Sequence, residues 1–299
     1  MRLLVLGANG QVGRELRRSL RPLGEVLAAT RDGRLDGGTP CAVADLGDLD
    51  GLARLVREAA PDAVVNAAAY TAVDKAEDDA ATAFRINAEA PEVLARACAE
   101  AGIPLVHYST DYVFDGQGTR PYREDDPPAP LGVYGASKLA GEQAVRAAGG
   151  RHLVFRTAWV YAAHGHNFLR TMLRLGAERE ELRVVADQVG TPTPAALIAE
   201  VTAQALADRG ASGTWHLVAA GQTSWHGFAE AIFAEAVAAG LLPRSPRVLP
   251  IASADYPTRA RRPAYSRLDT ARLERDFGVG LPDWRDGLRA VVAELARAG

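Results

Sequence analysis

The chain begins Met1-Arg2-Leu3-Leu4-Val5-Leu6 and continues directly into Gly7-Ala8-Asn9-Gly10-Gln11-Val12-Gly13, and this stretch decides the fold. The first six residues form an apolar run too short for a signal peptide and predict a strand. The glycines suit a sharp turn into a helix at 14–21, where a bare backbone can approach a pyrophosphate and the helix N-terminus offers free N–H groups. We expect Gly7, Asn9, Gly10, Gln11, Val12 and Gly13 to bind a dinucleotide. The alternative is a turn that only packs helix on strand.

Beyond this turn, short runs rich in Val and Leu alternate with longer segments of helical composition. Further strands are predicted at 26–29, 63–66, 104–108 and 153–156, with a crossover helix at 48–60. Strands alternating with helices indicate parallel βαβ units. The predicted fold class is α/β, a Rossmann-type doubly wound parallel sheet with a smaller mixed α/β substrate-binding domain. Pro91 interrupts a helical stretch at 79–101 and predicts a kink or a new helix start.

After about residue 157 the regular alternation loosens. Helices are predicted there at 167–178, 195–208, 224–239 and 284–297. We expect residues 1–157 to form the dinucleotide-binding domain and residues 158–299 to bind mainly the substrate. The boundary stays open, because the segment at about 187–218 has the composition to return to the first domain.

Composition narrows the class of protein. The 299 residues are 48% hydrophobic and 24% charged, with a formal net charge of -3, so no basic surplus favours nucleic acid or an anionic membrane as partner. No run approaches the roughly 18 apolar residues of a membrane-spanning helix. Cys41 and Cys98 show no CxxC spacing, which fits free buried thiols in a reducing cytoplasm. The sequence leaves monomer and homodimer open.

The end of the second strand bears on which dinucleotide is bound. Thr30 and Arg31 come first and suit the 2′-phosphate of NADPH, whereas Asp32 suits the ribose 2′-OH of NADH. We favour NADPH, with NADH as the alternative cofactor and a solvated loop charge as the alternative for Arg31. Asp45 and Leu46 follow the third strand, where such folds often contact the adenine.

Tyr134 and Lys138 are four residues apart in a segment of helical composition, so they share one helix face. A phenol has an unperturbed pKa of about 10, and a neighbouring ammonium lowers it. Tyr134 is therefore predicted to donate a proton to a carbonyl that is being reduced. Thr110 ends a predicted strand, where ligands lie in open α/β sheets. We expect it to hydrogen-bond the substrate oxygen; the alternative is a hydroxyl that caps its own strand.

Longer motifs resemble the extended short-chain dehydrogenases that act on nucleotide sugars, and the resemblance covers essentially the whole chain. The motifs lie at 7–13, 66–74, 109–116, 134–138, 156–161, 187–193 and 262–269. The resemblance implies an NAD(P)H-dependent oxidoreductase with a dTDP-sugar substrate. The implied reaction is reduction of the 4-keto group of dTDP-4-dehydro-L-rhamnose to dTDP-L-rhamnose.

The resemblance also implies residue roles. Tyr134 would protonate the C4 oxygen, Lys138 would bind the nicotinamide ribose and lower the Tyr134 pKa, and Thr110 would bond the reacting oxygen. Asp111 and Trp159 would contact the sugar nucleotide. The cofactor site would be lined by Tyr108, Ala67, Ala68 and Ala69. For Trp159 the alternative is a core aromatic.

Other polar residues carry weaker signals. Arg259, Arg261 and Arg262 form a basic cluster suited to a diphosphate, with a solvated surface as the alternative, and we assign Arg262 to the substrate. His164 and His166 are expected to be solvated loop residues rather than metal ligands. Some members of the family use magnesium, but no residue set here specifies it, and we predict no metal site.

Two rival functions remain. One is an epimerase or dehydratase of the same fold, but Tyr112 stands where a dehydratase would carry a second acid after Asp111. The other is a non-catalytic NADP-binding regulatory subunit. Such relatives can lose the Tyr or the Lys, and both are present here, which favours an enzyme.

Overall fold

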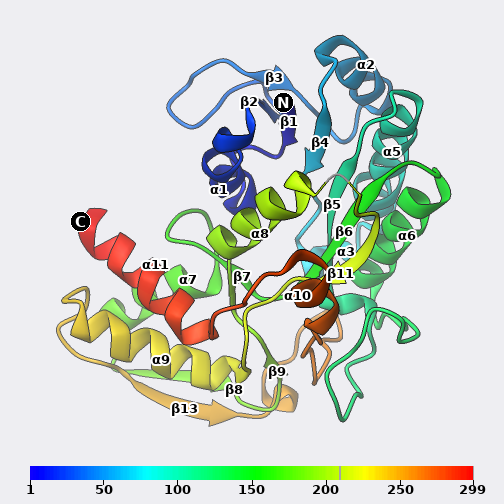
Figure 1. Cartoon of the computed structure of the whole chain (residues 1–299). Coiled ribbons are helices and arrows are strands. Elements are labelled where there is room, and N and C mark those ends of the chain that lie inside the picture. Colours follow the sequence, from blue (N-terminus) through cyan, green and yellow to red (C-terminus); the bar gives the residue numbers. More distant parts are fainter. Residues whose placement is uncertain (209, 299) are drawn as a thin grey trace.

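The computed structural model describes residues 1–208 and 210–298. Its centre is a seven-stranded parallel sheet in the order β11-β6-β5-β4-β1-β2-β3 (Figure 1). The strands are β1 (Arg2–Leu6), β2 (Glu25–Thr30), β3 (Ala42–Val43), β4 (Ala63–Asn66), β5 (Leu105–Thr110), β6 (His152–Thr157) and β11 (Gly213–His216). The strands after β1 are added first on one side of it (β2 and β3) and then on the other side (β4, β5 and β6). The order of the strands therefore switches between β1 and β4, and ligands are expected at the carboxyl ends of these two strands.

Helices cover both faces of this sheet. Alternate residues of β1 serve the two faces: Leu3 and Val5 pack with α1 (Gln11–Ser19) and α8 (Ala195–Ala207). Leu4 and Leu6 pack on the other face with the second set of helices. That set is α2 (Leu49–Ala59), α5 (Ala90–Glu100) and α6 (Val133–Ala147). Burial on both faces explains the continuous apolar strand, because a parallel sheet has no solvent side.

The rest of the chain forms a smaller unit of helices and short strand pairs, at the lower left of Figure 1. Its helices are α7 (Phe168–Glu178), α9 (Trp225–Ala238) and α11 (Trp284–Ala298), whereas α10 (Ala271–Phe277) packs beside β11 of the large sheet. Its strand pairs are β8 (Glu181–Val185) with β13 (Arg247–Ile251), β7 (Val160–Tyr161) with β10 (Thr193–Pro194), and β9 (Val189–Gly190) with β12 (Thr223–Ser224). Helix α8 and strand β11 leave this unit and pack on the large sheet.

The predicted α/β doubly wound fold is confirmed, with differences at element ends. The first helix starts at Gln11, inside the glycine motif, and β5 runs on to Thr110. Short α3 (Val73–Ala76) precedes the predicted helical stretch at 79–101, which divides into α4 (Ala80–Phe84), a π turn (Arg85–Glu89) and α5. Pro91 lies in the first turn of α5, where its missing N–H costs little.

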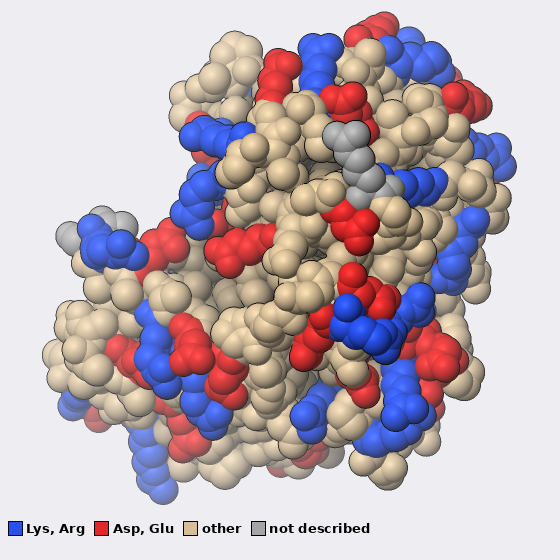
Figure 2. Space-filling model, in the orientation of Figure 1, with Lys and Arg blue, Asp and Glu red and all other residues tan. Residues whose placement is uncertain are grey.

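The surface carries mixed charge. Figure 2 shows acidic and basic side chains interspersed over one face, with a hollow on its left side. A groove of about 620 Å³ lies between α8 and α11, and its lining residues include none of the predicted site residues. Among the described residues, no helix is long and apolar enough to cross a membrane.

Candidate functional site

The glycine turn has the backbone that a dinucleotide requires. Gly7 has φ +75°, and a Cβ there would lie 2.7 Å from the backbone N of Ala68, just after β4. A Cβ on Gly13 would overlap the carbonyl of Gly7. Gly10 caps α1 without a side chain, and the first N–H groups of a helix have no intrahelical acceptor. The result is a helix end without side chains beside Ala67–Ala69, an arrangement that suits an anion.

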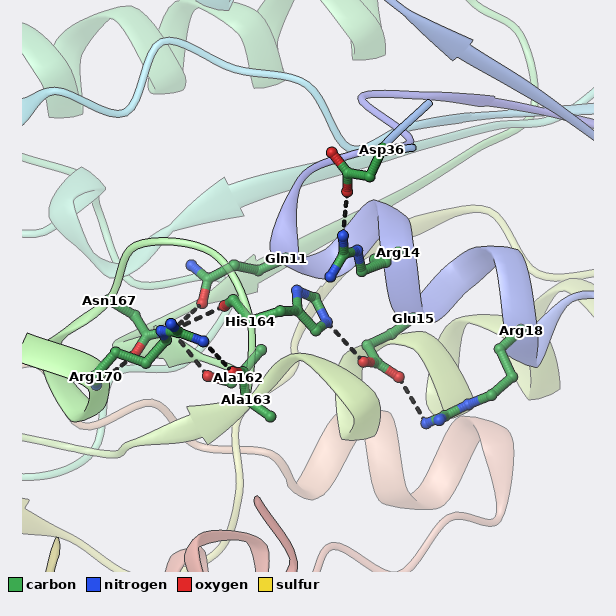
Figure 3. Close-up of polar contacts among 10 residues, drawn as sticks. All are labelled: Gln11, Arg14, Glu15, Arg18, Asp36, Ala162, Ala163, His164, Asn167 and Arg170. Carbon is green, nitrogen blue, oxygen red and sulfur yellow. Dashed lines mark hydrogen bonds and ion pairs between the residues drawn. The ribbon is translucent and has the colours of Figure 1, made fainter. Parts of the chain in front are cut away.

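The loop after β2 is tied to this turn. Asn9 donates from Nδ2 to the carbonyl of Arg34 (2.9 Å) and accepts from the backbone N of Asp36 (3.1 Å). Arg14 of α1 forms an ion pair with Asp36 (Figure 3). Asn9 therefore shapes the loop at 31–40 rather than standing free, so its contribution to a cofactor site is through that loop.

Thr30 does not present its hydroxyl to a ligand, contrary to the prediction. It is 5% exposed, and its Oγ1 bonds Asp32 Oδ1 (3.0 Å) and accepts from the backbone N of Arg34 (3.0 Å). The same bond from Thr30 is the main reason that the pKa of Asp32 lies below its ordinary value. Arg31 and Arg34 are the exposed cations at this strand end. Arg34 was not predicted, because it lies three residues beyond the strand.

A loop from the smaller unit docks on α1 (Figure 3). Asn167, which caps α7, donates from Nδ2 to Gln11 Oε1 (2.8 Å). His164 Nε2 lies 2.9 Å from Glu15 Oε1, and this bond is the main cause of the lowered pKa of Glu15. The prediction that His164 is solvated is therefore wrong, whereas His166 is exposed. Gln11 meets the smaller unit through its side chain.

The residues predicted near the adenine differ in exposure. Leu46 is 5% exposed and belongs to the core under α2, so its side chain faces inward rather than toward a ligand. Asp45 is half-buried and accepts from the backbone N of Gly47 (2.9 Å). Val12 is half-buried in the first turn of α1 and packs against the core.

Helix α6 brings Tyr134 and Lys138 to the carboxyl end of β5. Tyr134 hydrogen-bonds Thr110, and its ring meets Tyr112 edge-on at 5.5 Å between centroids. Lys138 is 2% exposed and donates from Nζ to the carbonyl oxygen of Tyr108 (2.6 Å). The structure thus places Tyr134, Lys138 and Thr110 together, as the sequence predicted.

The electrostatics of this group differ from the prediction. Desolvation and the nearby Asp111 raise the pKa of Tyr134, and hydrogen bonding to Thr110 only partly opposes them. Burial lowers the pKa of Lys138 to about 8, while Glu142 acts in the opposite direction. The Lys138 ammonium donates its hydrogen bond to the Tyr108 carbonyl. It is not among the groups that lower the pKa of Tyr134.

The neighbours of Thr110 on β5 have other partners. Ser109 contributes to the lowered pKa of Glu142 on α6, whereas Thr110 is the hydroxyl that acts on Tyr134. The Tyr108 side chain is 9% exposed and bonds Thr202 of α8 (2.8 Å), inside the core. The prediction that Tyr108 lines the cofactor site is limited to its backbone carbonyl, because its ring packs in the core between the sheet and α8.

The predicted substrate residues form the next layer. Asp111 is 2% exposed, and burial raises its pKa to about 6 against bonds from Ser266 and Thr110. Arg262 pairs with Asp74 (2.6 Å) and lies 3.4 Å from the Tyr112 hydroxyl. It therefore reaches the catalytic group through Tyr112.

Trp159 has an unusual backbone and a fixed ring. Its φ is +48°, a strained value for a bulky residue. The ring stacks on Trp225 with centroids 3.6 Å apart, and a Cβ on Gly190 would come within 2.5 Å of it. Trp225 is itself held by Gln188 (3.2 Å). Trp225 was not singled out from the sequence, since an aromatic at a helix start is unremarkable without its partner.

One further feature lay beyond sequence reasoning. Asn87, in the π turn, bonds the backbone of Tyr70 and the hydroxyl of Ser137 on α6, so it holds the catalytic helix in place. Among residues 1–208 and 210–298, no group of three or more His, Cys, Asp or Glu side chains is arranged to hold a metal ion.

The chain is similar to known proteins over nearly its whole length. The sequence matches the family described as RmlD substrate binding domain over residues 1–297. It is 54% identical to the dTDP-4-dehydrorhamnose reductase of Burkholderia thailandensis and 46% identical to that of Escherichia coli K12. These alignments cover 99% of this chain and 99% and 98% of the relatives. The crystal structure of dTDP-4-dehydrorhamnose reductase from Bacillus anthracis in complex with NADP superposes with a TM-score of 0.89. It is 36% identical, over 98% of this chain and 99% of that chain.

The identity and coverage extend over both units of the chain, so the glycine turn, the Tyr134 group and the smaller unit are matched together. The chain therefore belongs to the RmlD substrate binding domain family, as an oxidoreductase of the extended short-chain dehydrogenase fold.

Proposed function

We propose that the chain reduces the 4-keto group of dTDP-4-dehydro-L-rhamnose to dTDP-L-rhamnose with NADPH. The observation that carries the proposal is the placement of Tyr134, bonded to Thr110 and one helical turn from Lys138, at the sheet edge that also holds the glycine turn. The curated relatives named above are reductases of this substrate, and the related crystal structure contains NADP.

The cofactor fits the residues present. Gly10 leaves the N-terminus of α1 without a side chain, and exposed Arg31 and Arg34 suit a 2′-phosphate. When bound, NADPH supplies the hydride for the carbonyl carbon. Lys138, turned to the carboxyl end of β5, holds the nicotinamide ribose.

The protein's own step is proton delivery. Tyr134 donates its phenolic proton to the C4 oxygen as negative charge develops there, and Thr110 turns its hydroxyl from Asp111 (3.0 Å) to donate a hydrogen bond to the same oxygen. The raised pKa of Tyr134 keeps the phenol protonated before the reaction, as a proton donor requires. Asp111, Trp159 and Arg262 contact the sugar nucleotide, with Arg262 released from Asp74 to meet the diphosphate.

The direct test is NADPH oxidation with dTDP-4-dehydrorhamnose. We expect oxidation that depends on both reactants and yields dTDP-rhamnose; no oxidation with either NADPH or NADH would remove the proposed reaction. Tyr134→Phe is expected to lose most turnover, by about 10²-fold or more, with nearly unchanged NADPH affinity. Tyr161→Phe is the matched control, because the buried Tyr161 hydroxyl has no hydrogen-bond partner among the described residues.

The cofactor preference has its own test. Replacing Arg31 and Arg34 together with Ala is expected to raise KM for NADPH by about 10-fold or more while changing KM for NADH little, since the lost charges face only the 2′-phosphate. Arg21→Ala, an exposed arginine after α1, is the control. Equal effects on both cofactors would place the 2′-phosphate elsewhere.

We also propose that the chain acts in the cytoplasm as a monomer or homodimer. Cys41 and Cys98 are both free, which suits a reducing compartment. The domain assignment remains 1–157 for the cofactor and 158–299 mainly for the nucleotide sugar, with part of 187–218 contributing to the first. The pairing of β11 with β6 supports that last point.

A further inference from the structure

A buried ion pair lies behind the catalytic helix. Glu142 follows Lys138 by one turn of α6 and is completely buried, and Arg156 on β6 is 3% exposed. Arg156 donates from Nε to Glu142 Oε1 (2.9 Å) and from Nη2 to Oε2 (2.8 Å). It also donates to the carbonyl of Glu124 (3.3 Å) and lies over the ring of Phe114. The carboxylate is therefore held in one orientation.

Stability alone does not explain why this ion pair is buried. Removing two charges from water costs as much as their attraction returns in many proteins, and apolar replacements are often as stable. Burial raises the pKa of Glu142, but the bonds and charge of Arg156, with Ser109 and Arg146, outweigh burial and keep the pKa below its ordinary value. Glu142 is thus a fixed negative charge inside the protein.

Lys138 is the group on which this charge acts. On its own helix, Tyr134 lies one turn before it and Glu142 one turn after it. From β5, its Nζ binds the Tyr108 carbonyl, and its charge acts on His107. Burial and the Lys138 charge keep His107 neutral. Arg156 on β6 is engaged by Glu142. Glu142 is therefore the carboxylate that favours the charged form of Lys138, against a burial effect that lowers its pKa to about 8.

The choice of lysine at this position is itself informative. Lys75 and Lys138 are the only lysines in the sequence. Every other position that carries a lysine or an arginine carries an arginine. A guanidinium stays charged at any accessible pH, but a buried ammonium can lose its proton. A lysine kept in this setting needs a neighbour that secures its charge.

We propose that Glu142, fixed by Arg156, is a positioning residue that keeps the ammonium of Lys138 charged and directed toward the carboxyl end of β5. Its consequence for turnover rests on the proposed function, because Lys138 then holds the nicotinamide ribose next to Tyr134. The electrostatic link between Glu142 and Lys138 does not depend on the substrate.

The small number of lysines gives a direct measurement. Protein labelled with ¹³Cε-lysine shows the Lys138 and Lys75 signals, and Lys75→Arg assigns them; exposed Lys75 serves as internal reference. The Lys138 signal is followed against pH in the free protein and in the NADP⁺ complex. We expect a wild-type midpoint near 8 in the free protein. A wild-type midpoint below about 7 overturns the proposal without any variant, since Lys138 would then be largely neutral at physiological pH.

The decisive variant is Glu142→Gln with Arg156→Met, which removes both charges and leaves no unpaired buried guanidinium. We expect the Lys138 midpoint to fall by about one unit or more, and the basic limb of the kcat/KM profile to move with it. Glu142→Gln alone should shift the midpoint at least as far. Arg146→Gln is the matched control, because half-exposed Arg146 also contacts Glu142 (3.3 Å) but its loss leaves the carboxylate charge in place.

Circular dichroism and thermal unfolding establish that each variant is folded. A folded double variant whose Lys138 midpoint is unchanged overturns the proposal, even if its turnover falls, because Glu142 would then act only as scaffold. A shifted midpoint in protein that lacks the proposed reductase activity would retain the electrostatic link and reject only the substrate. The two failures are thereby separated.

Discussion

At the scale of single residues, the site is governed by an acid beside a phenol. Asp111 is buried next to Tyr134. Together with desolvation, the Asp111 charge raises the pKa of Tyr134, and burial raises the pKa of Asp111 itself to about 6. At neutral pH the protein therefore carries a buried carboxylate that folding alone would not select. A buried charge that lowers the stability of the folded protein is typical of functional positions.

Asp111→Asn is expected to stabilise the protein at pH 7.5 while reducing turnover. An acid whose pKa rises from 3.8 to about 6 on folding favours the native state at low pH, and stability falls as pH rises through that window. The full effect is about 3 kcal/mol, and we expect a gain of about 1–2 kcal/mol after loss of hydrogen-bond strength. Urea unfolding at pH 7.5 and pH 4 measures it, and the gain should vanish at pH 4.

Asp115→Asn provides a control of opposite sign. The backbone N of Gln117 and the Tyr122 hydroxyl hold the pKa of Asp115 below its ordinary value, so its charged form is favoured in the folded protein. Its replacement should destabilise the protein at pH 7.5. If both variants destabilise equally at pH 7.5, Asp111 is not the buried charge described here.

The sequence could predict which residues meet but not their electrostatics. Tyr134 and Lys138 come together because local helix geometry sets their spacing, and Thr110 joins them because parallel strands end at one edge. The lowered pKa predicted for Tyr134 was wrong, since desolvation and Asp111 act through tertiary packing. For the same reason Arg34, Asn87 and Trp225 carried no sequence signal.

At the scale of elements, the turn from β1 into α1 is the most constrained segment, and its glycines differ in kind. A Cβ on Gly13 would overlap the Gly7 carbonyl, whereas a Cβ on Gly10 would lie 3.2 Å from the same oxygen. Gly10 has φ -68°, which any residue adopts, and it is exposed at the helix end. Gly13 is therefore required for packing, whereas Gly10 leaves access for a ligand.

Gly13→Ala is therefore expected to destabilise the fold by about 3 kcal/mol, in the range of overpacked sites. Gly10→Ala should retain the melting temperature within a few degrees but weaken NADP⁺ binding by about 10-fold, because the methyl group lies where the pyrophosphate approaches. Differential scanning calorimetry and titration calorimetry separate the two effects. Unchanged NADP⁺ affinity in Gly10→Ala would show that the pyrophosphate does not lie over this helix end.

Elements were predictable where hydrophobic periodicity is strong. Five strands of the large sheet (β1, β2, β4, β5 and β6) and the long helices α7, α8, α9 and α11 were predicted within a few residues, whereas no range was predicted for β3 and β11. The two-residue strands, such as β9 with β12, and the π turn were not, because such short elements lack a periodic pattern and exist only through their tertiary partners.

At the scale of the whole molecule, one hydrophobic core joins the two units. It connects Leu3 of β1 and Leu16 of α1 with Ile198 of α8, and it continues to Phe228 of α9 and Trp284 of α11. Helix α8 packs beside α1, and β11 completes the large sheet next to β6. Neither unit can be removed without exposing apolar surface of the other.

We therefore expect a single cooperative unfolding transition, with equal calorimetric and van't Hoff enthalpies. NADPH at 100 times its Kd should stabilise the whole molecule by about 2.7 kcal/mol, and a dTDP-sugar should shift the same transition. Ile198→Ala, at the buried junction of the two units, should lower stability by about 2–5 kcal/mol without splitting the transition. Two separate transitions, each responding to one ligand, would show that the units fold independently and that the core through α8 does not couple them.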